Sequence, residues 1–267
     1  MAPKYLFKIK DEILAEVKAK ISSKTKIVLL CDYDGTLTPI RKIPSMAVLS
    51  NTMKDLINKL KTKRCFSFGI VTGRSQKDIS KLIDCRDMTI ISNHGLQITK
   101  RKKVWIHPQA KRIIPLLKII YHLLEEAVNP FGSALIENKK LTLTVHYRNV
   151  KSDLIRILKK KVFEIVRQHN RKVKTTSGKK IIEVRPNISW NKGKAVQKIL
   201  RTVNTRNNKP RILYMGDDNT DEDVFKILGK NAITVRVGQK RKSCAHYYVK
   251  NISEVQKFLE WVDSVNN

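Results

Sequence analysis

A short apolar strand that runs directly into a pair of carboxylates constrains the fold of this chain more than any other segment. Ile27–Cys31 is five consecutive apolar residues, a pattern typical of a central parallel strand covered on both faces. Asp32 and Asp34 follow at once, and Gly35 then lets the chain turn. Strands of an open parallel sheet deliver their C-terminal residues to the crevice where ligands bind. Because residues two apart share a face of an extended chain, both carboxylates are expected in one cleft, where their repulsion favours a bound cation or a shared proton.

The rest of the chain alternates predicted strands with amphipathic helices, which is the rhythm of a parallel sheet. An amphipathic helix through Leu6, Ile13 and Ile21 is predicted before the first strand. A second helix, capped by Ser50 or Asn51, follows the two carboxylates. Further strands are predicted at residues 66–71, 89–92, 211–215, 232–237 and 247–249.

Residues 106–186 interrupt that rhythm with the order α-β-β-α-β-β. Within this insertion, Leu141–Tyr147 alternates apolar and polar residues, so one face of its strand should be covered and the other open. The last two strands are expected to form a hairpin that turns at Ser177 and Gly178. The predicted fold class is therefore α/β, with a Rossmann-like parallel-sheet core made of residues 1–105 and 187–267 and an inserted α+β cap domain at 106–186.

Composition allows a globular protein and gives no sign of a membrane span. Apolar residues make up 41% of the 267 residues, enough for a sizeable core. The longest apolar runs are far shorter than the ~20 residues that cross a bilayer, and no signal-peptide segment follows Met1. We therefore expect a cytoplasmic protein. The four cysteines lack C-x-x-C spacing, so neither a zinc site nor a disulfide framework is predicted.

The charge balance is strongly basic, with 55 Lys and Arg against 23 Asp and Glu, a formal net charge of +32. Such a field concentrates anions and would speed the capture of a phosphorylated substrate, and it would also attract nucleic acid. The basic residues are scattered, without the aromatic residues that a single-strand groove interleaves with them. A nucleic-acid partner is therefore not expected, and a solvated basic surface is the simpler interpretation.

Functional-looking side chains follow three separate strands. Thr72 and Arg74 come after the strand at 66–71, and four acids lie within seven residues of Asp217 after the strand at 211–215. Because parallel strands end at the same edge of a sheet, these groups should lie near Asp32 and Asp34. Carboxylate oxygens and water are the ligands that Mg²⁺ prefers. The sequence thus predicts a magnesium site at this edge.

The residues that carry this chemistry resemble the haloacid dehalogenase-like phosphohydrolases, whose four motifs occur in order at Asp32–Thr36, Thr72, Lys192 and Gly216–Asp218. More narrowly, the chain is similar to the trehalose-6-phosphate phosphatases between residues of about 25 and 240. The narrower match rests on six segments: Asp32–Ile40, Asn93–Gly95, Glu137–Arg148, Glu183–Pro186, Trp190–Ala195 and Gly216–Phe225. The departures are small, since Cys31 replaces a bulky apolar residue and Val71-Thr72 replaces a frequent Ile-Ser.

The resemblance implies a role for each residue of the core. Asp32 would be the nucleophile that forms an aspartyl phosphate, and Asp34 the general acid and base. Mg²⁺ would be held by Asp32, the Asp34 main-chain carbonyl and Asp217. Thr72 and Lys192 would bind the phosphoryl oxygens that are not transferred. Outside the inner metal ligands, the resemblance adds Asp218 and Asp221 as groups that orient a metal-bound water or Lys192.

The resemblance also implies how substrate is recognised. Glu137, Lys139 and Glu183 of the cap would bind the distal glucose hydroxyls, and the cap is expected to close over the sugar. The remaining expected substrate-binding residues are Arg74, Asn93 and His94.

Three alternatives stay open at this stage. The same chemistry could act on the phosphate of sucrose, or on a glucosylglycerol or mannosylglycerate precursor. A basic nucleic-acid-binding protein on a phosphatase-like scaffold is a rival of another class. The third is an allosteric or assembly partner of a trehalose-phosphate synthase, with which a phosphatase could also pair functionally. A monomer is expected.

Overall fold

The structure is a computed structural model that describes residues 2–7, 15, 19, 26–41, 43–178, 180–203 and 210–264. These form two compact units, one from Met1–Trp105 with Trp190–Asn267 and the other from Ile106–Ser189. We call them the core unit and the cap unit. Most of the predicted N-terminal helix lies outside the described residues, and Leu6, which was assigned to it, lies in a turn after a two-residue strand.

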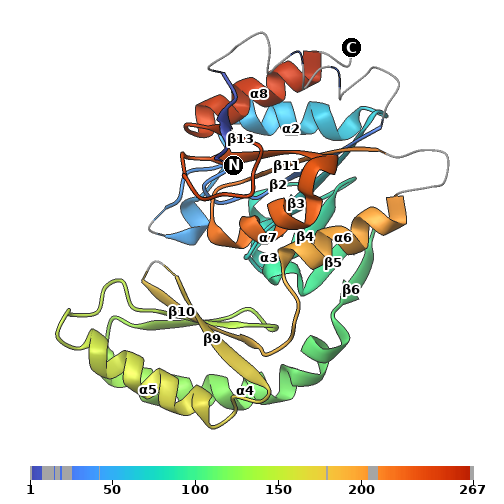
Figure 1. Cartoon of the computed structure of the whole chain (residues 1–267). Coiled ribbons are helices and arrows are strands. Elements are labelled where there is room, and N and C mark those ends of the chain that lie inside the picture. Colours follow the sequence, from blue (N-terminus) through green and yellow to red (C-terminus); the bar gives the residue numbers. More distant parts are fainter. Residues whose placement is uncertain are drawn as a thin grey trace. The chain divides into compact units, whose positions relative to one another are not determined.

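In the described part of the chain the core unit is built on one nine-stranded sheet (Figure 1). Along the sheet the strands are β1 (Lys4–Tyr5), β13 (Tyr247–Val249), β12 (Ala232–Val237), β11 (Arg211–Gly216), β2 (Ile27–Cys31), β3 (Phe66–Val71), β4 (Thr89–Ser92), β5 (Gln97–Lys100) and β6 (Lys103–Ile106). The pairs from β1 to β4 are parallel, and β5 is antiparallel to β4. All five residues of β2 are buried, as predicted for a central strand.

Helices cover both faces of the core sheet, as Figure 1 shows for α2 and α8 on one side and α6 and α7 on the other. Alternate residues of β2 separate the two layers: Ile27 and Leu29 pack with the first pair of helices, and Val28 and Leu30 with the second. The core helices are α2 (Asn51–Thr62), α3 (Gln76–Leu82), α6 (Lys192–Val203), α7 (Asn219–Leu228) and α8 (Ile252–Ser264). Short 3₁₀ turns lie at Pro44–Met46, Asn93–Gly95, Asn129–Phe131 and Gly229–Asn231.

The cap unit is an antiparallel sheet with two helices on one face (Figure 1). Its elements are α4 (Pro108–Val128), β7 (Leu135–Asn138), β8 (Leu143–His146), α5 (Ile155–Arg167), β9 (Val173–Gly178) and β10 (Ile181–Pro186), in the sheet order β7-β8-β10-β9. Leu143 and Val145 are buried against the helices, as the alternation predicted, but the face predicted to be open is not, because Thr142 and Thr144 are 0% and 1% exposed. The parallel core sheet and the separate antiparallel cap sheet confirm the predicted α/β fold class.

One local prediction needs correction, and one hairpin was not predicted. The turn predicted at Ser177 and Gly178 is wrong, because Gly178 is still in β9 and pairs with Ile181. The chain reverses after it, where Lys180 has a φ of 64°. The hairpin of β5 and β6 was not predicted. Arg101 and Lys102 make its turn with φ of 45° and 65°, and charged residues are not the usual sign of such a turn. Neither turn uses the Gly or Asn that normally marks positive φ.

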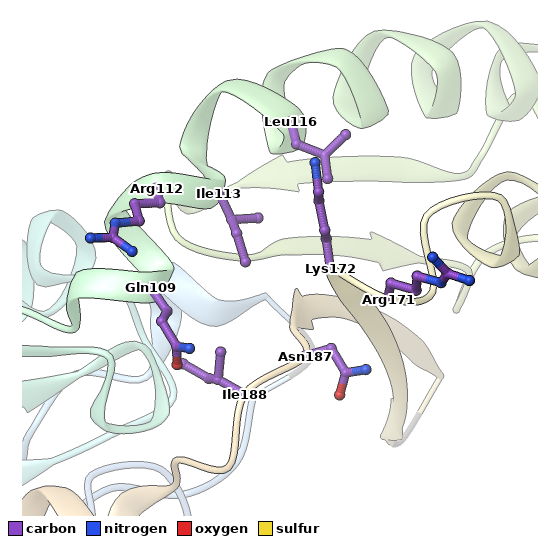
Figure 2. A pocket seen from close by; sticks show the side chains of 8 residues that line it. All are labelled: Gln109, Arg112, Ile113, Leu116, Arg171, Lys172, Asn187 and Ile188. Atoms are coloured by element: carbon purple, nitrogen blue, oxygen red, sulfur yellow. The ribbon is translucent and has the colours of Figure 1, made fainter.

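A cavity of about 380 Å³ opens in the cap unit beside the first turns of α4 (Figure 2). Residues 171–172 and 187–188 complete its lining, and Lys172 extends toward Leu116. None of its eight lining residues is a predicted site residue. In the described residues, the helices are all too short or too polar to cross a membrane.

Candidate active site

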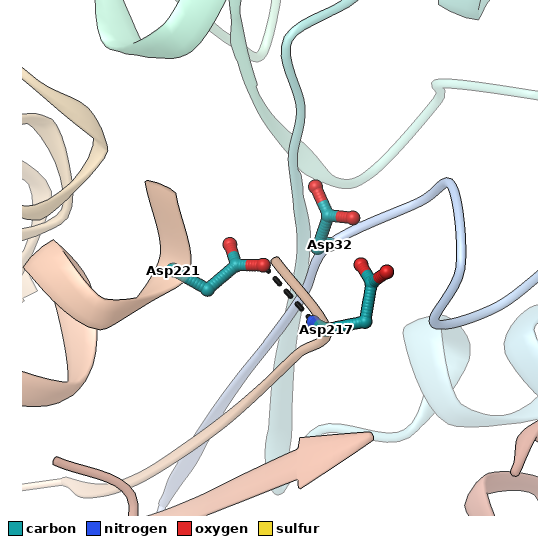
Figure 3. Close-up of side chains that lie close together, drawn as sticks. All are labelled: Asp32, Asp217 and Asp221. Atoms are coloured by element: carbon teal, nitrogen blue, oxygen red, sulfur yellow. Dashed lines mark hydrogen bonds between the residues drawn. The ribbon is translucent and has the colours of Figure 1, made fainter. Parts of the chain in front are cut away.

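The residues predicted from separate segments of the core meet at the C-terminal edge of its sheet. Asp32 follows β2, and its N–H donates to the Met215 carbonyl of β11 at 2.8 Å. Lys192 begins α6, and its Nζ lies 2.7 Å from Asp32 Oδ1 and 2.9 Å from Asp221 Oδ1. Asp217 follows β11, and carboxylate oxygens of Asp32, Asp217 and Asp221 lie within 4.8 Å of one another (Figure 3).

Asp221 is fully buried, and every contact that it makes holds another part of the site. Its Oδ1 accepts from Lys192 and from the Tyr214 hydroxyl, the latter at 2.7 Å. Its Oδ2 accepts the N–H groups of Asp217 and Asp218 at 3.0 Å each, the first of which Figure 3 draws. With both oxygens occupied, Asp221 orients Lys192 and the loop after β11 rather than offering a free oxygen to an ion.

A divalent cation fits the space beside Asp32 and Asp217. Asp217 Oδ1 is buried and has no hydrogen-bond partner among the described residues. Gly35, at φ +84°, lies so close that any side-chain carbon there would overlap the Asp217 carboxylate. Three carboxylates converge here and the Lys192 ammonium contacts two of them, Asp32 and Asp221, so Asp217 has no ion pair with this lysine. The donors are all oxygens, which suits a hard cation such as Mg²⁺.

The electrostatics of the cluster follow from its burial. Burial raises the pKa of Asp217 to about 7, and the Asp221 and Asp218 carboxylates add to that rise. Burial also raises the pKa of Asp32, while Lys192 opposes the effect. For Lys192 burial alone lowers the pKa, but Asp221 and Asp32 outweigh it and keep the ammonium charged. A bound cation would oppose protonation of the Asp32 and Asp217 carboxylates.

Asp34, the predicted proton donor, is bound by an arginine. Arg74 donates from Nε and Nη2 to the two oxygens of Asp34, each at 2.6 Å. The same Nη2 donates to the Pro44 carbonyl at 2.8 Å, and the guanidinium lies 5.4 Å from the centre of the Tyr33 ring. Arg74 was predicted to bind substrate, and in the structure it forms a bidentate pair of hydrogen bonds with the Asp34 carboxylate.

The loops after β3 and β4 support each other beside this pair. Thr72 is buried, and its Oγ1 accepts the Arg74 N–H at 3.1 Å, which leaves its own O–H to donate. The N–H groups of Asn93 and His94 donate to the carbonyls of Arg74 and Thr72 at 2.8 and 3.1 Å. Asn93 and His94 have φ of 49° and 54°, a left-handed backbone that is unusual for side chains of this size. The His94 ring fills the space over Gly73 that a side chain would occupy.

Asp218 serves mainly as the N-cap of α7. Its Oδ1 accepts from the N–H groups of Thr220 and Asp221, and Asp221 reciprocates in a capping box. Burial raises the pKa of Asp218, but Lys192 and the Thr220 hydrogen bonds outweigh it and lower that pKa overall.

The cap residues predicted to bind sugar form their own cluster on the polar face of the cap sheet. The strand register places Glu137 and Glu183 on either side of Thr144. Lys139 Nζ lies 3.8 Å from Glu137 and 3.8 Å from Glu183. His146 Nε2 lies 3.0 Å from Glu137 Oε2. The predicted set Glu137, Lys139 and Glu183 is therefore brought together within the cap unit.

Two residues that hold the core site together were missed by the sequence analysis. Tyr214 lies within an apolar strand, and nothing in its context marks its hydroxyl as a partner of Asp221. Arg236 did leave a signal, because it is a charged residue in the middle of the apolar strand β12. It donates to the carbonyls of Asp217 and Asp218 and to Glu222 Oε1, and so braces the loop after β11.

Comparison with known proteins finds relatives that match most of the chain. The family model for trehalose-phosphatase matches residues 30–257. The chain is 32% identical to "Probable trehalose-phosphate phosphatase G" of Arabidopsis thaliana, over 92% of this chain and 71% of that protein. A crystal structure of a trehalose-6-phosphate phosphatase related protein superposes with a TM-score of 0.78 at 28% identity, covering 89% of this chain and 97% of the other. The C-terminal domain of the Candida albicans trehalose-6-phosphate phosphatase has a similar fold, with a TM-score of 0.80 at 24% identity and 99% of each chain covered.

Proposed function

The chain belongs to the trehalose-phosphatase family of haloacid dehalogenase-like hydrolases, so its reaction is the hydrolysis of a phosphoric monoester. On that premise we propose that it converts trehalose 6-phosphate to trehalose and phosphate with Mg²⁺. One observation carries the chemistry. The buried Lys192 joins Asp32 to Asp221 beside an Asp217 oxygen that has no hydrogen-bond partner among the described residues. That arrangement supports a nucleophilic carboxylate next to a cation site.

In the proposed reaction Asp32 attacks phosphorus in line with the ester bond. The bond from phosphorus to the sugar oxygen breaks, its electron pair stays on that oxygen, and Asp34 supplies the proton. A water then attacks the aspartyl phosphate and gives its proton to Asp34, which releases phosphate and restores Asp32. Mg²⁺, held by Asp32, the Asp34 main-chain carbonyl and Asp217, would offset the charge of the nucleophile and of the phosphoryl oxygens.

Lys192 and Thr72 supply positive charge and a hydroxyl to the same group. Lys192 is fixed by two carboxylates at 2.7 and 2.9 Å, so no reorganisation is needed as charge develops on the phosphoryl oxygens. Thr72 has its O–H free to donate because its oxygen already accepts from the Arg74 N–H. The cap cluster of Glu137, Lys139 and Glu183 offers carboxylates and an ammonium to vicinal hydroxyls, which favours a sugar over a simple alkyl phosphate.

The direct test is phosphate release from a panel of sugar phosphates, with Mg²⁺ or with chelator. We expect trehalose 6-phosphate to be hydrolysed with the highest kcat/KM, above sucrose, glucosylglycerol and mannosylglycerate phosphates. Chelation and Asp32→Asn are both expected to abolish turnover, because one removes the cation and the other the nucleophile. Equal activity on all sugar phosphates would contradict the substrate, and turnover in Asp32→Asn would contradict the covalent route.

A further inference from the structure

Arg74 is held by more contacts than a substrate ligand needs. Its guanidinium donates to both oxygens of Asp34 at 2.6 Å and to the Pro44 carbonyl at 2.8 Å, and it stacks on the Tyr33 ring. Its side chain is 11% exposed, and that of Asp34 is 35% exposed. The arginine is therefore mostly buried, and the carboxylate that it binds is more accessible to solvent.

The hydrogen bonds from Arg74 orient the Asp34 carboxylate. Asp34 comes just before Gly35, whose φ of +84° marks the turn out of the strand. Among the described residues, Arg74 alone donates side-chain hydrogen bonds to it. A planar fork that engages both oxygens fixes the plane of the carboxyl group, which a lysine cannot do.

We propose that Arg74 is a positioning residue for proton transfer by Asp34, and that it does not bind the substrate phosphate. The inference rests on the proposed function, because it assigns the geometry of the acid in that reaction. A carboxyl group has about four lone-pair sites, and the arginine occupies two of them. The remaining sites can hold the proton that moves to the sugar oxygen as the ester bond breaks.

This role makes the requirement for Arg74 depend on the leaving group. A sugar alkoxide is a poor leaving group and needs the proton, whereas 4-nitrophenolate leaves unprotonated. In the step that forms the aspartyl phosphate, an arginine that positions the acid is needed for the first ester much more than for the second. An arginine that binds phosphate is needed equally for both, since the phosphoryl group is the same.

The experiment measures kcat and KM for trehalose 6-phosphate and for 4-nitrophenyl phosphate in four variants beside the wild type. Arg74→Met removes the grip, Arg74→Lys keeps the charge, and Asp34→Asn removes the acid. Arg86→Met is the matched control, because among the described residues Arg86 forms an ion pair only with Asp84, and its side chain is 85% exposed. Positioned proton transfer is worth roughly 10²–10⁴ in rate.

We expect Arg74→Met to lower kcat/KM for trehalose 6-phosphate by about 10²-fold and kcat/KM for 4-nitrophenyl phosphate by less than about fivefold. The comparison uses kcat/KM because it covers only the steps up to the aspartyl phosphate, whereas kcat also includes the later attack by water, in which Asp34 serves both esters. Arg74→Lys should not restore the loss, Asp34→Asn should show the same dependence on the leaving group, and Arg86→Met should match the wild type. Equal losses of kcat/KM on both esters in Arg74→Met, or rescue by lysine, would overturn the inference.

Crystal structures of the wild type and Arg74→Met separate this inference from the proposed substrate. These structures show where the Asp34 carboxylate lies, and the comparison does not depend on enzymatic activity. If trehalose 6-phosphate is not hydrolysed, the substrate proposal fails, and the same comparison is made with the alkyl phosphate that is hydrolysed best. An Asp34 carboxylate that keeps its place in Arg74→Met overturns the inference, and a displaced or rotated one supports it. Thermal melts show which variants are folded, and Arg74→Gln replaces methionine if that variant is not.

Discussion

The acidic residues of the core and those of the cap are held in different ways. In the core, Asp32 and Asp221 accept from Lys192 at 2.7 and 2.9 Å, and all three side chains are at most 7% exposed. In the cap, Lys139 lies 3.8 Å from Glu137 and from Glu183, beyond hydrogen-bond distance. The lysine of the core cluster is within hydrogen-bond distance of two carboxylates, whereas the lysine of the cap cluster makes only longer ion pairs and Glu137 has its close contact with His146, at 3.0 Å.

The difference matches what each cluster has to do. Catalytic stabilisation of charge is strongest when the donors are already in place, because reorganising them during the reaction raises the barrier. Recognition of sugar hydroxyls instead needs carboxylates and ammonium groups that can exchange one partner for another. A tightly paired glutamate and lysine would have to break their own bond before binding a hydroxyl. The loose cap cluster therefore suits binding, and the tight core cluster suits chemistry.

The largest effect is expected from breaking the core cluster at Lys192. Lys192→Met leaves Asp32 and Asp221 buried without their cation, which typically lowers the free energy of unfolding by about 3–5 kcal/mol. It also removes the proposed donor to the phosphoryl oxygens, so we expect kcat to fall by about 10³-fold on every phosphate ester. Lys198→Met is the control, because Lys198 is exposed on the same helix and lies over the Trp105 ring. Urea unfolding and phosphate release measure both effects, and activity within tenfold of the wild type would mean that Lys192 has no catalytic part.

A smaller and more selective effect is expected in the cap. Lys139→Met removes the ammonium between Glu137 and Glu183, and hydrogen bonds to charged groups are worth about 1.5–3 kcal/mol, so kcat/KM for trehalose 6-phosphate should fall by roughly 10- to 100-fold. Hydrolysis of 4-nitrophenyl phosphate, which has no sugar, should stay within about twofold. Lys140→Met, at the exposed neighbouring position, is the control. If both esters lost activity to the same degree, the cap cluster would have no role in specificity.

The contrast between the two clusters also explains what could be predicted from sequence. Asp32, Lys192 and Asp217 occupy positions that the parallel fold brings together, so strand ends and motifs were enough to predict their meeting. The hydroxyl of Tyr214 was not predictable, because a tyrosine in a buried strand reads as one more apolar residue. The hydrogen bonds between Arg74 and Asp34 depend on how side chains from two loops meet, and the spacing of the residues in the sequence does not reveal this. The turns at Arg101-Lys102 and Lys180 were missed or misplaced because charged residues there adopt positive φ without the usual Gly or Asn.

The smallest effects come from a matched pair of single hydrogen bonds, one in each cluster. Tyr214→Phe removes the buried donor to Asp221, and His146→Phe removes the partly exposed partner of Glu137. The core bond is to a buried carboxylate, so its loss should lower the free energy of unfolding by about 1.5–3 kcal/mol. The His146 and Glu137 side chains are 29% and 34% exposed, and pairs that reach solvent are worth about 0–1 kcal/mol. Urea unfolding of both variants measures the difference, and equal losses would show that the cap cluster is as tightly held as the core.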